Sequence, residues 1–143
     1  MRVLGLDLGE RRIGVAISDP LGITASGVEV IQRAGLDRDL ARLSALIGEN
    51  EVGEVVVGLP RHMNGSMGEA ARKAQEFAAM LEARLEEMGL APRFTFWDER
   101  LSTVAAQRAL LEGDMSRAKR KQVVDKVAAA IILRAYLDSK PRA

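Results

Sequence analysis

Residues 3–19, VLGLDLGERRIGVAISD, decide how this chain is interpreted, because they place an acid at the end of an apolar run. The apolar runs 3–6 and 13–17 predict two buried strands, and the short connection between them predicts an antiparallel hairpin. Asp7 ends the first of these strands. An acid buried there usually becomes neutral or finds a cation, so Asp7 needs an explanation.

Alternation along the first strand separates Asp7 from the leucines. Leu4 and Leu6 face one side of a strand, whereas Gly5, Asp7 and Gly9 face the other. We expect the two glycines to leave room beside the carboxylate for a metal ion and a phosphate. The same acid could instead cap a turn by accepting backbone hydrogen bonds, and the pattern alone leaves both interpretations open.

Composition predicts one domain over residues 1–143, long enough for a sizeable core. The net charge of +1 neither requires nor excludes nucleic acid as a partner. The absence of cysteine excludes disulfides, zinc–cysteine sites and thiol nucleophiles. No signal-peptide pattern or membrane-length apolar run occurs, so we expect a cytoplasmic protein with no membrane partner.

The rest of the chain predicts an α/β fold. We expect a third strand at 23–31, a helix at 37–50, a strand at 54–57, a helix capped by Ser66 with Glu69 and ended by Gly89, a strand at 93–97, a helix at 103–111 and a last helix after 121 to about 137. Phe96 and Trp97 are expected in the core. The buried face of the second helix should comprise Ala70, Ala74, Phe77, Ala78, Leu81, Leu85 and Met88. This order indicates a mixed five-stranded sheet with helices on both faces, compatible with the ribonuclease H-like fold.

Two further acidic sites resemble Asp7 in their placement. Asp98 and Glu99 end the strand at 93–97, and Asp125 lies at the start of the last helix, on the border of its apolar face. Asp98 could simply cap a helix, and Asp125 could be a first-turn acid that the helix dipole favours. Together the acids predict a metal site, since a divalent cation relieves the repulsion between close carboxylates. Oxygen ligands favour Mg²⁺ or Mn²⁺ over zinc.

Four blocks carry a family resemblance: GLDLGERRIGVAISD, VVGLPRHMNGSMGEAA, DERLSTVAAQRALL and KQVVDKVAAAIILRAYLD. Together they resemble the YqgF/RuvX family, described as Holliday junction resolvases and as pre-16S rRNA nucleases, from residue 3 to about 138. The resemblance implies a ribonuclease H-like fold and a metal-dependent nuclease site made by Asp7, Glu99 and Asp125. Related resolvases use a glutamate at the second position, and Asp98 remains its rival.

The resemblance also implies a reaction. Asp7 would bridge two Mg²⁺ or Mn²⁺ ions, one activating a water and the other stabilising the leaving oxygen. The expected substrate is precursor 16S ribosomal RNA, with branched DNA, the Holliday junction, as the alternative. The sequence leaves open whether the protein is a monomer or a homodimer.

Glycines and basic side chains near these acids are the candidate substrate contacts. The loop 58–66 should face the substrate, and Arg11 and a basic run that includes Arg117, placed before the last helix, should contact backbone phosphates. The residues proposed to bind substrate are Arg12, Gly65, Ser66, Arg100, Lys119, Arg120 and Lys121. Solvated charge and an ordinary helix start are the alternative explanations. Aromatic residues make up 3% of the chain, so we expect recognition of shape and backbone rather than base stacking.

Two other classes of protein remain possible from the sequence. Actin-like and sugar-kinase-like ATPases also use an Asp followed by Gly in a strand-turn-strand, but they need two such domains. A non-catalytic RNA- or ribosome-binding module with a vestigial site is the other alternative. The three intact acids argue against it.

Overall fold

The structure, a computed structural model, describes residues 1–61, 64–101 and 117–140, with the side chains of 117–126 outside the description. Its elements are β1 (Arg2–Leu8), β2 (Arg12–Ser18), β3 (Ala25–Gln32), α1 (Leu36–Glu49), β4 (Val52–Leu59), α2 (Glu69–Glu87), β5 (Arg93–Asp98), the 3₁₀ turn η1 (Glu99–Leu101) and α4 (Arg117–Ser139). The helix predicted at 103–111 lies outside the described residues.

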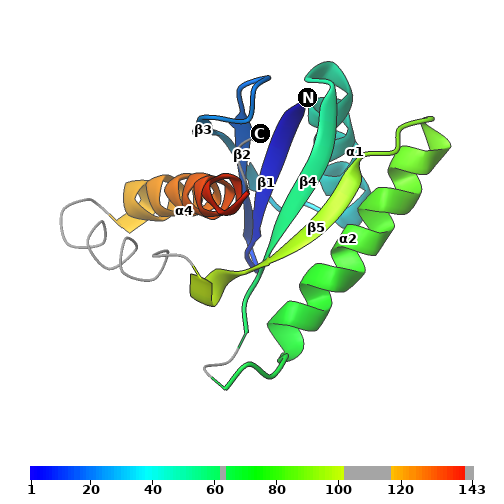
Figure 1. Cartoon of the computed structure of the whole chain (residues 1–143). Coiled ribbons are helices and arrows are strands. Elements are labelled where there is room, and N and C mark those ends of the chain that lie inside the picture. Colours follow the sequence, from blue (N-terminus) through cyan, green and yellow to red (C-terminus); the bar gives the residue numbers. More distant parts are fainter. Residues whose placement is uncertain (62–63, 102–116, 141–143) are drawn as a thin grey trace.

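The five strands form one mixed sheet in the order β3-β2-β1-β4-β5 (Figure 1). The predicted hairpin is confirmed: β1 pairs with β2, and β2 with β3, in antiparallel fashion, whereas β1–β4 and β4–β5 are parallel pairs. Helix α4 covers one face of the sheet, and α1 and α2 cover the other. The predicted mixed sheet with helices on both faces is therefore confirmed.

Two apolar cores lie on the two faces of the sheet. On the α1 and α2 side, Leu4 and Leu6 of β1 belong to the larger core, as their alternation predicts. On the α4 side the core consists of Val3, Ala16, Val56, Ala128, Ala129, Ile132, Leu133 and Tyr136. Its many small side chains let α4 approach the sheet closely. A Cβ added to Gly5 would lie only 2.9 Å from the Cβ of Leu133.

The expectation that Gly5 leaves room beside Asp7 for a metal and a phosphate is therefore wrong. The space above Gly5 is filled by α4, whose Leu133 side chain and Ala129 carbonyl oxygen occupy it. Gly5 lets helix and sheet pack together, and its role is in packing rather than in ligand access.

The predicted start of α2 is also wrong. Gly68 is the N-cap residue and makes no side-chain cap, while the Ser66 hydroxyl donates a hydrogen bond of 2.7 Å to Oδ1 of Asn64. A bridge between Arg61 and Met67 closes the preceding loop, so Ser66 belongs to a turn and not to the helix end.

The buried face of α2 differs slightly from the predicted one. Ala71 is buried where Ala70 was expected, and Met88 is 53% exposed because it follows the last helical residue. Phe96 is 40% exposed, since it lies on the edge strand β5 where little covers it. Trp97 packs against the core beneath α4.

Helix α4 begins earlier than its sequence indicated. It starts at Arg117, so Lys119, Arg120 and Lys121 lie inside the helix and not before it. Lys, Arg, Ala and Gln are all good helix formers, which explains why the basic run continues the helix. Asp125 consequently lies in the third turn rather than the first. Among the described residues no helix is long and apolar enough to cross a membrane.

Candidate active site

Asp7 lies on the face of the sheet that α4 covers. Alternation fixes this, because Val3 belongs to the core beneath α4 and Gly5 touches Leu133 of that helix. The Asp7 residue is buried, with 7% of its surface exposed. The carboxylate is thus held near the C-terminal end of β1, away from the leucine face, as alternation predicts.

The side chain of Glu99, in the turn η1 that follows β5, reaches the same face of the sheet. Its Oε1 lies 2.7 Å from the position that a Cβ on Gly58 would occupy. Because Gly5 pairs with Val56 and Leu6 with Val57, the register places Gly58 of β4 beside Asp7 of β1. Asp7 and the Glu99 carboxylate therefore lie on the same face of the sheet, and Glu99 Oε1 lies over Gly58, the residue beside Asp7 on the neighbouring strand.

Gly58 therefore has a different role from the one its sequence suggested. A Cβ there would also lie 2.8 Å from Cδ1 of Ile132. The absent side chain makes space for the carboxylate of Glu99 and for α4, whereas the sequence placed Gly58 at the start of a loop that should face the substrate.

Asp98 points away from this pair. Its Cα partner in the sheet is Leu59, which packs in the core on the α1 and α2 side. The Arg100 guanidinium donates to both of its oxygens, from Nε at 3.0 Å and from Nη2 to Oδ2 at 2.6 Å. These hydrogen bonds from Arg100 hold the pKa of Asp98 below its usual value. Asp98 thus serves to orient Arg100.

Asp125 belongs to α4, but its side chain lies outside the described residues. The direction of the helix still locates it. Ile132 lies over Gly58 near the end of β4, and Tyr136 contacts Glu54 near the start of that strand, so α4 runs antiparallel to β4. Residues before Ile132 consequently lie at the end of the sheet where Asp7 is. The side chains of Lys119, Arg120 and Lys121 also lie outside the described residues.

Arg12 flanks Asp7 from β2. Ile13 belongs to the core on the α1 and α2 side, so Arg12 and Gly14 face α4, and Gly14 is the Cα partner of Asp7. Arg12 is half-buried, and its Nε is buried without a hydrogen-bond partner among the described residues. A buried guanidinium N–H normally has an acceptor.

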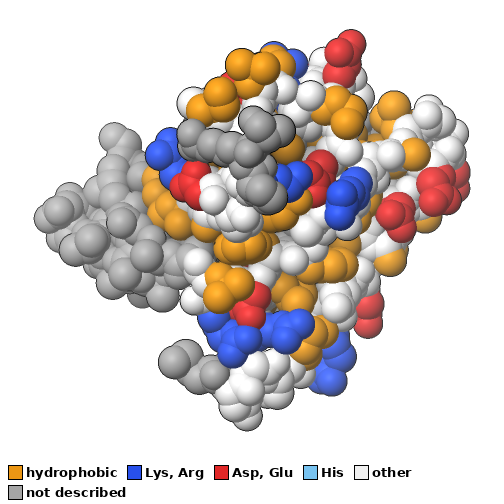
Figure 2. Space-filling model, in the orientation of Figure 1, with side chains coloured by type: hydrophobic (Ala, Val, Ile, Leu, Met, Phe, Trp, Pro, Cys, Tyr) orange, Lys and Arg blue, Asp and Glu red, His pale blue; other side chains and the backbone are white. Residues whose placement is uncertain are grey.

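The loop between β4 and α2 is tied to Arg100. Gly65 has a φ of 86°, a left-handed conformation that favours glycine. A Cβ at Gly65 would lie 3.4 Å from Nη1 of Arg100, and Arg61 donates to the Gly65 carbonyl oxygen at 3.3 Å. Ser66 is exposed. Figure 2 shows Lys and Arg side chains gathered where this loop meets η1 and the start of α2.

The donors of this site suit a hard cation. Asp7 and Glu99 supply carboxylate oxygens, which Mg²⁺ and Mn²⁺ prefer. No cluster of three His, Cys, Asp or Glu that could hold a metal occurs among the described side chains, a set that leaves out Asp125.

Sequence reasoning missed another buried acid, Glu54, at the opposite end of β4. Its carboxylate accepts hydrogen bonds from the Tyr136 hydroxyl, from Thr95 Oγ1 at 2.7 Å and from Lys140 Nζ at 3.0 Å. Burial opposes its ionisation, but these three hydrogen bonds outweigh burial and lower the pKa of Glu54. The alternation of β4, which puts Glu54 on the same face as Val56, was the available signal.

Known proteins resemble this chain over almost its whole length. The family model described as "RuvX: Holliday junction resolvase" matches residues 1–139. A Clostridium tetani protein named "Putative pre-16S rRNA nuclease" is 52% identical over 97% of both chains, and one of the same name from Syntrophomonas wolfei is 53% identical over 96% of this chain and 94% of its own.

Solved structures of resolvases share the fold. RuvC of Thermus thermophilus, in complex with Holliday junction substrate, matches with a TM-score of 0.58 and 18% identity over 96% of this chain and 93% of that one. The fowlpox virus Holliday junction resolvase matches with a TM-score of 0.56 and 14% identity over 98% and 100%. The ribonuclease H-like fold is thereby confirmed. The chain belongs to the RuvX family.

Proposed function

We propose that this protein is a metal-dependent nuclease that hydrolyses phosphodiester bonds in precursor 16S ribosomal RNA. The observation that supports this most is that buried Asp7 and the Glu99 carboxylate lie on the same face of the sheet, with Glu99 Oε1 over Gly58, the residue beside Asp7. The names of relatives about half identical to this chain support the same substrate. Such a role would place the protein in the cytoplasm.

Asp7, Glu99 and Asp125 are the residues that would hold Mg²⁺ or Mn²⁺. A pair of such ions, when bound, would activate a water for attack on phosphorus and stabilise the oxygen that leaves. Arg12 and Arg100 would bind and orient the phosphate oxygens. The ion pair with Asp98 holds Arg100 in place. Gly65, Ser66, Lys119, Arg120 and Lys121 would extend these contacts along the backbone.

A Holliday junction resolvase is the second candidate function. The fold match to RuvC, solved with its junction substrate, favours it. Paired cuts in a four-way junction require a symmetric dimer, whereas trimming of a precursor RNA does not.

One experiment separates these functions. Purified protein is incubated with Mg²⁺ or Mn²⁺ on a labelled 16S precursor RNA and on a four-way DNA junction, beside folded Asp7→Asn protein. We expect the wild type to cut the RNA and the variant to cut neither. Cleavage of the DNA junction but not of the RNA would identify the protein as a Holliday junction resolvase. An Asp7→Asn variant as active as the wild type would exclude Asp7 from the reaction. RNA binding without any cleavage would identify a non-catalytic module.

The second ligand has its own test. Glu99→Gln should lose more activity than the roughly 10–100-fold that removal of an outer-shell partner costs, because it takes an oxygen ligand from beside Asp7. Asp98→Asn should cost less, since it only loosens Arg100. Rates with Mn²⁺ at saturating RNA measure both. A larger loss in Asp98→Asn would make Asp98 the ligand.

A further inference from the structure

The C-terminal ends of four strands lie at the same end of the sheet. β3 is antiparallel to β2, which is antiparallel to β1, so β1, β3, β4 and β5 all run in the same direction. Their C-terminal ends therefore share one edge of the sheet, and the candidate site lies there. The residues that follow these strands by a few positions therefore lie at the same end of the molecule.

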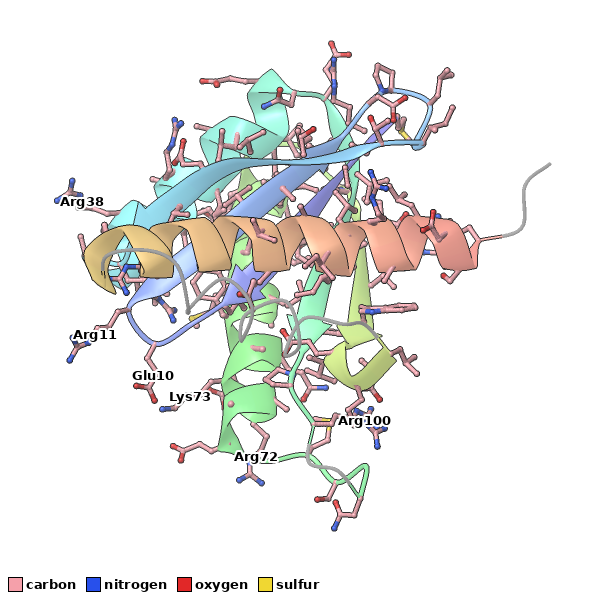
Figure 3. All side chains as sticks on the ribbon, turned by 90° about the vertical axis from the view of Figure 1, so that its left-hand side faces the viewer. Glu10, Arg11, Arg38, Arg72, Lys73 and Arg100 are labelled. Atoms are coloured by element: carbon pink, nitrogen blue, oxygen red, sulfur yellow. The ribbon has the colours of Figure 1, made fainter. Side chains whose placement is uncertain are left out.

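Three exposed arginines that are not part of the candidate site follow the C-terminal ends of these strands. Arg11 lies in the turn after β1, Arg38 in the first turn of α1 after β3, and Arg72 in the first turn of α2 after β4. In Figure 3 all three point outward from the ribbon, along an arc that ends at Arg100. We name Arg11, Arg38 and Arg72 the arginine rim.

The rim arginines differ from several other surface cations in lacking an ion-pair partner among the described residues. Arg42 is paired with Glu29 at 2.5 Å, Lys73 with Glu69 at 3.4 Å and Arg100 with Asp98. Within the described part of the chain, none of the three rim arginines forms an ion pair. An exposed guanidinium without an ion-pair partner has all of its N–H donors available. It binds a phosphate through two parallel hydrogen bonds.

We propose that the arginine rim binds backbone phosphates of the nucleic acid at a distance from the bond that is cut. This inference rests on the proposed nuclease function and extends it to the form of the substrate. Asp7 and Glu99 lie on the α4 side of the sheet, whereas Arg38 and Arg72 belong to α1 and α2, the helices that cover the other face. A bound strand therefore crosses the end of the sheet, and the protein recognises a longer segment than the nucleotides at the site.

Acids also lie along the rim, and Glu10 is the one next to Arg11. Glu10 is exposed beside Arg11, and Figure 3 shows it between Arg11 and Lys73. A phosphate backbone that follows the rim is repelled by Glu10, so removing this charge should strengthen binding. The rim thus predicts effects of opposite sign for neighbouring residues, which a purely structural role would not produce.

Binding without cleavage tests the rim. Fluorescence anisotropy in EDTA is measured with a short RNA and with a longer RNA of the same central sequence. The rim variant is Arg38→Gln with Arg72→Gln. The control is Arg93→Gln with Arg134→Gln, which removes the same charge from exposed arginines at the start of β5 and on α4.

The wild type should bind the longer RNA more tightly than the short one, and the rim variant should lose this gain. Its affinity for the longer RNA should fall about tenfold at about 0.1 M salt, and the slope of log K against log salt should drop by about two. The control should match the wild type, and Glu10→Gln should bind more tightly.

A rim variant with the affinity and salt slope of the wild type would overturn the inference. So would an equal loss in the control, or an equal loss on both RNAs. Cleavage by the wild type is assayed separately with Mn²⁺. Its absence would refute the nuclease function, while the EDTA binding data would still decide whether the rim contacts nucleic acid.

Discussion

Gly58 shows how one missing side chain makes the candidate site possible. It stands beside Asp7 in the sheet, and the carboxylate of Glu99 occupies the space that its Cβ would fill. Ile132 of α4 closes in from the other side. Any larger residue at this position would have to displace the acid, the helix or both.

We predict that Gly58→Ala destroys activity far more than it destabilises the fold. The new methyl would lie 2.7 Å from Glu99 Oε1 and displace it. Overpacking against Ile132 should cost about 1–3 kcal/mol of unfolding free energy. Cleavage rates and urea unfolding together measure the two effects.

Gly48→Ala is the matched control. It adds the same methyl inside α1, where the nearest atom of Leu90 is 3.6 Å away, and should leave activity unchanged while stabilising the helix. Full activity in Gly58→Ala would show that the carboxylate of Glu99 does not need this position.

Ser66→Ala should leave the stability of α2 unchanged. A capping serine contributes about 1 kcal/mol, but Ser66 bonds to Asn64 and not to the helix end. The expected change in unfolding free energy is within about 0.5 kcal/mol, as measured by urea denaturation. If Ser66 contacts a phosphate, RNA affinity should nevertheless fall. A loss of 1 kcal/mol or more would restore the capping role.

At the scale of elements, α4 is fixed to the sheet at its C-terminal end. Tyr136 and Lys140 both donate to Glu54 of β4, Lys140 lies 4.9 Å from the centre of the Tyr136 ring, and Trp97 packs edge-on against that ring at 5.9 Å. Since Asp125 belongs to the same helix, these contacts position the third candidate ligand from the opposite end of the sheet.

We predict that Glu54 makes the fold sensitive to acid. Its pKa is lowered in the folded state, so its ionised form stabilises the fold above the unfolded value of about 4.5, and this contribution is lost as the pH falls through the folded pKa. Glu54→Gln should therefore be less stable than the wild type near neutral pH, and the difference should shrink below about pH 4.5.

Urea unfolding at a series of pH values measures this difference. Glu82→Gln on the exposed face of α2 serves as a control that removes a carboxylate without such partners. A difference between Glu54→Gln and wild type that stays constant with pH would contradict the prediction.

Features that depend on local periodicity could be predicted from the sequence. The hairpin, the face of Asp7 and the mixed sheet follow from alternation and element order alone. The beginning of α4 at Arg117 was missed although the helix propensity of its first residues favours it. The turn that holds Ser66 could not be predicted, because the Ser66 hydroxyl bonds to Asn64 and not to the helix end. That Glu99 shares a face of the sheet with Asp7 while Asp98 faces the other side depends on the register of β4 against β1 and β5, which no single segment encodes.

At the scale of the whole molecule, the two ends of the sheet carry different groups of side chains. The edge with the C-terminal ends of β1, β3, β4 and β5 carries Asp7, Glu99 and the arginine rim. The other edge carries the hydrogen bonds that fix α4 to Glu54. A cation bound by Asp7, Glu99 and Asp125 would join β1, η1 and α4, so its binding should stabilise the fold as a whole.

We therefore predict that Mg²⁺ or Mn²⁺ raises the melting temperature of the wild type in the absence of any nucleic acid. Binding to the folded state alone stabilises by about 2.7 kcal/mol when the ion is at 100 times its Kd. Asp7→Asn should lose most of this shift. Ser66→Ala, which keeps all three acids, should retain it, and EDTA should reverse it. Calorimetric scans over a range of metal concentrations measure the effect. An equal shift in wild type and Asp7→Asn would mean that the cations bind elsewhere and would remove Asp7 from the metal site.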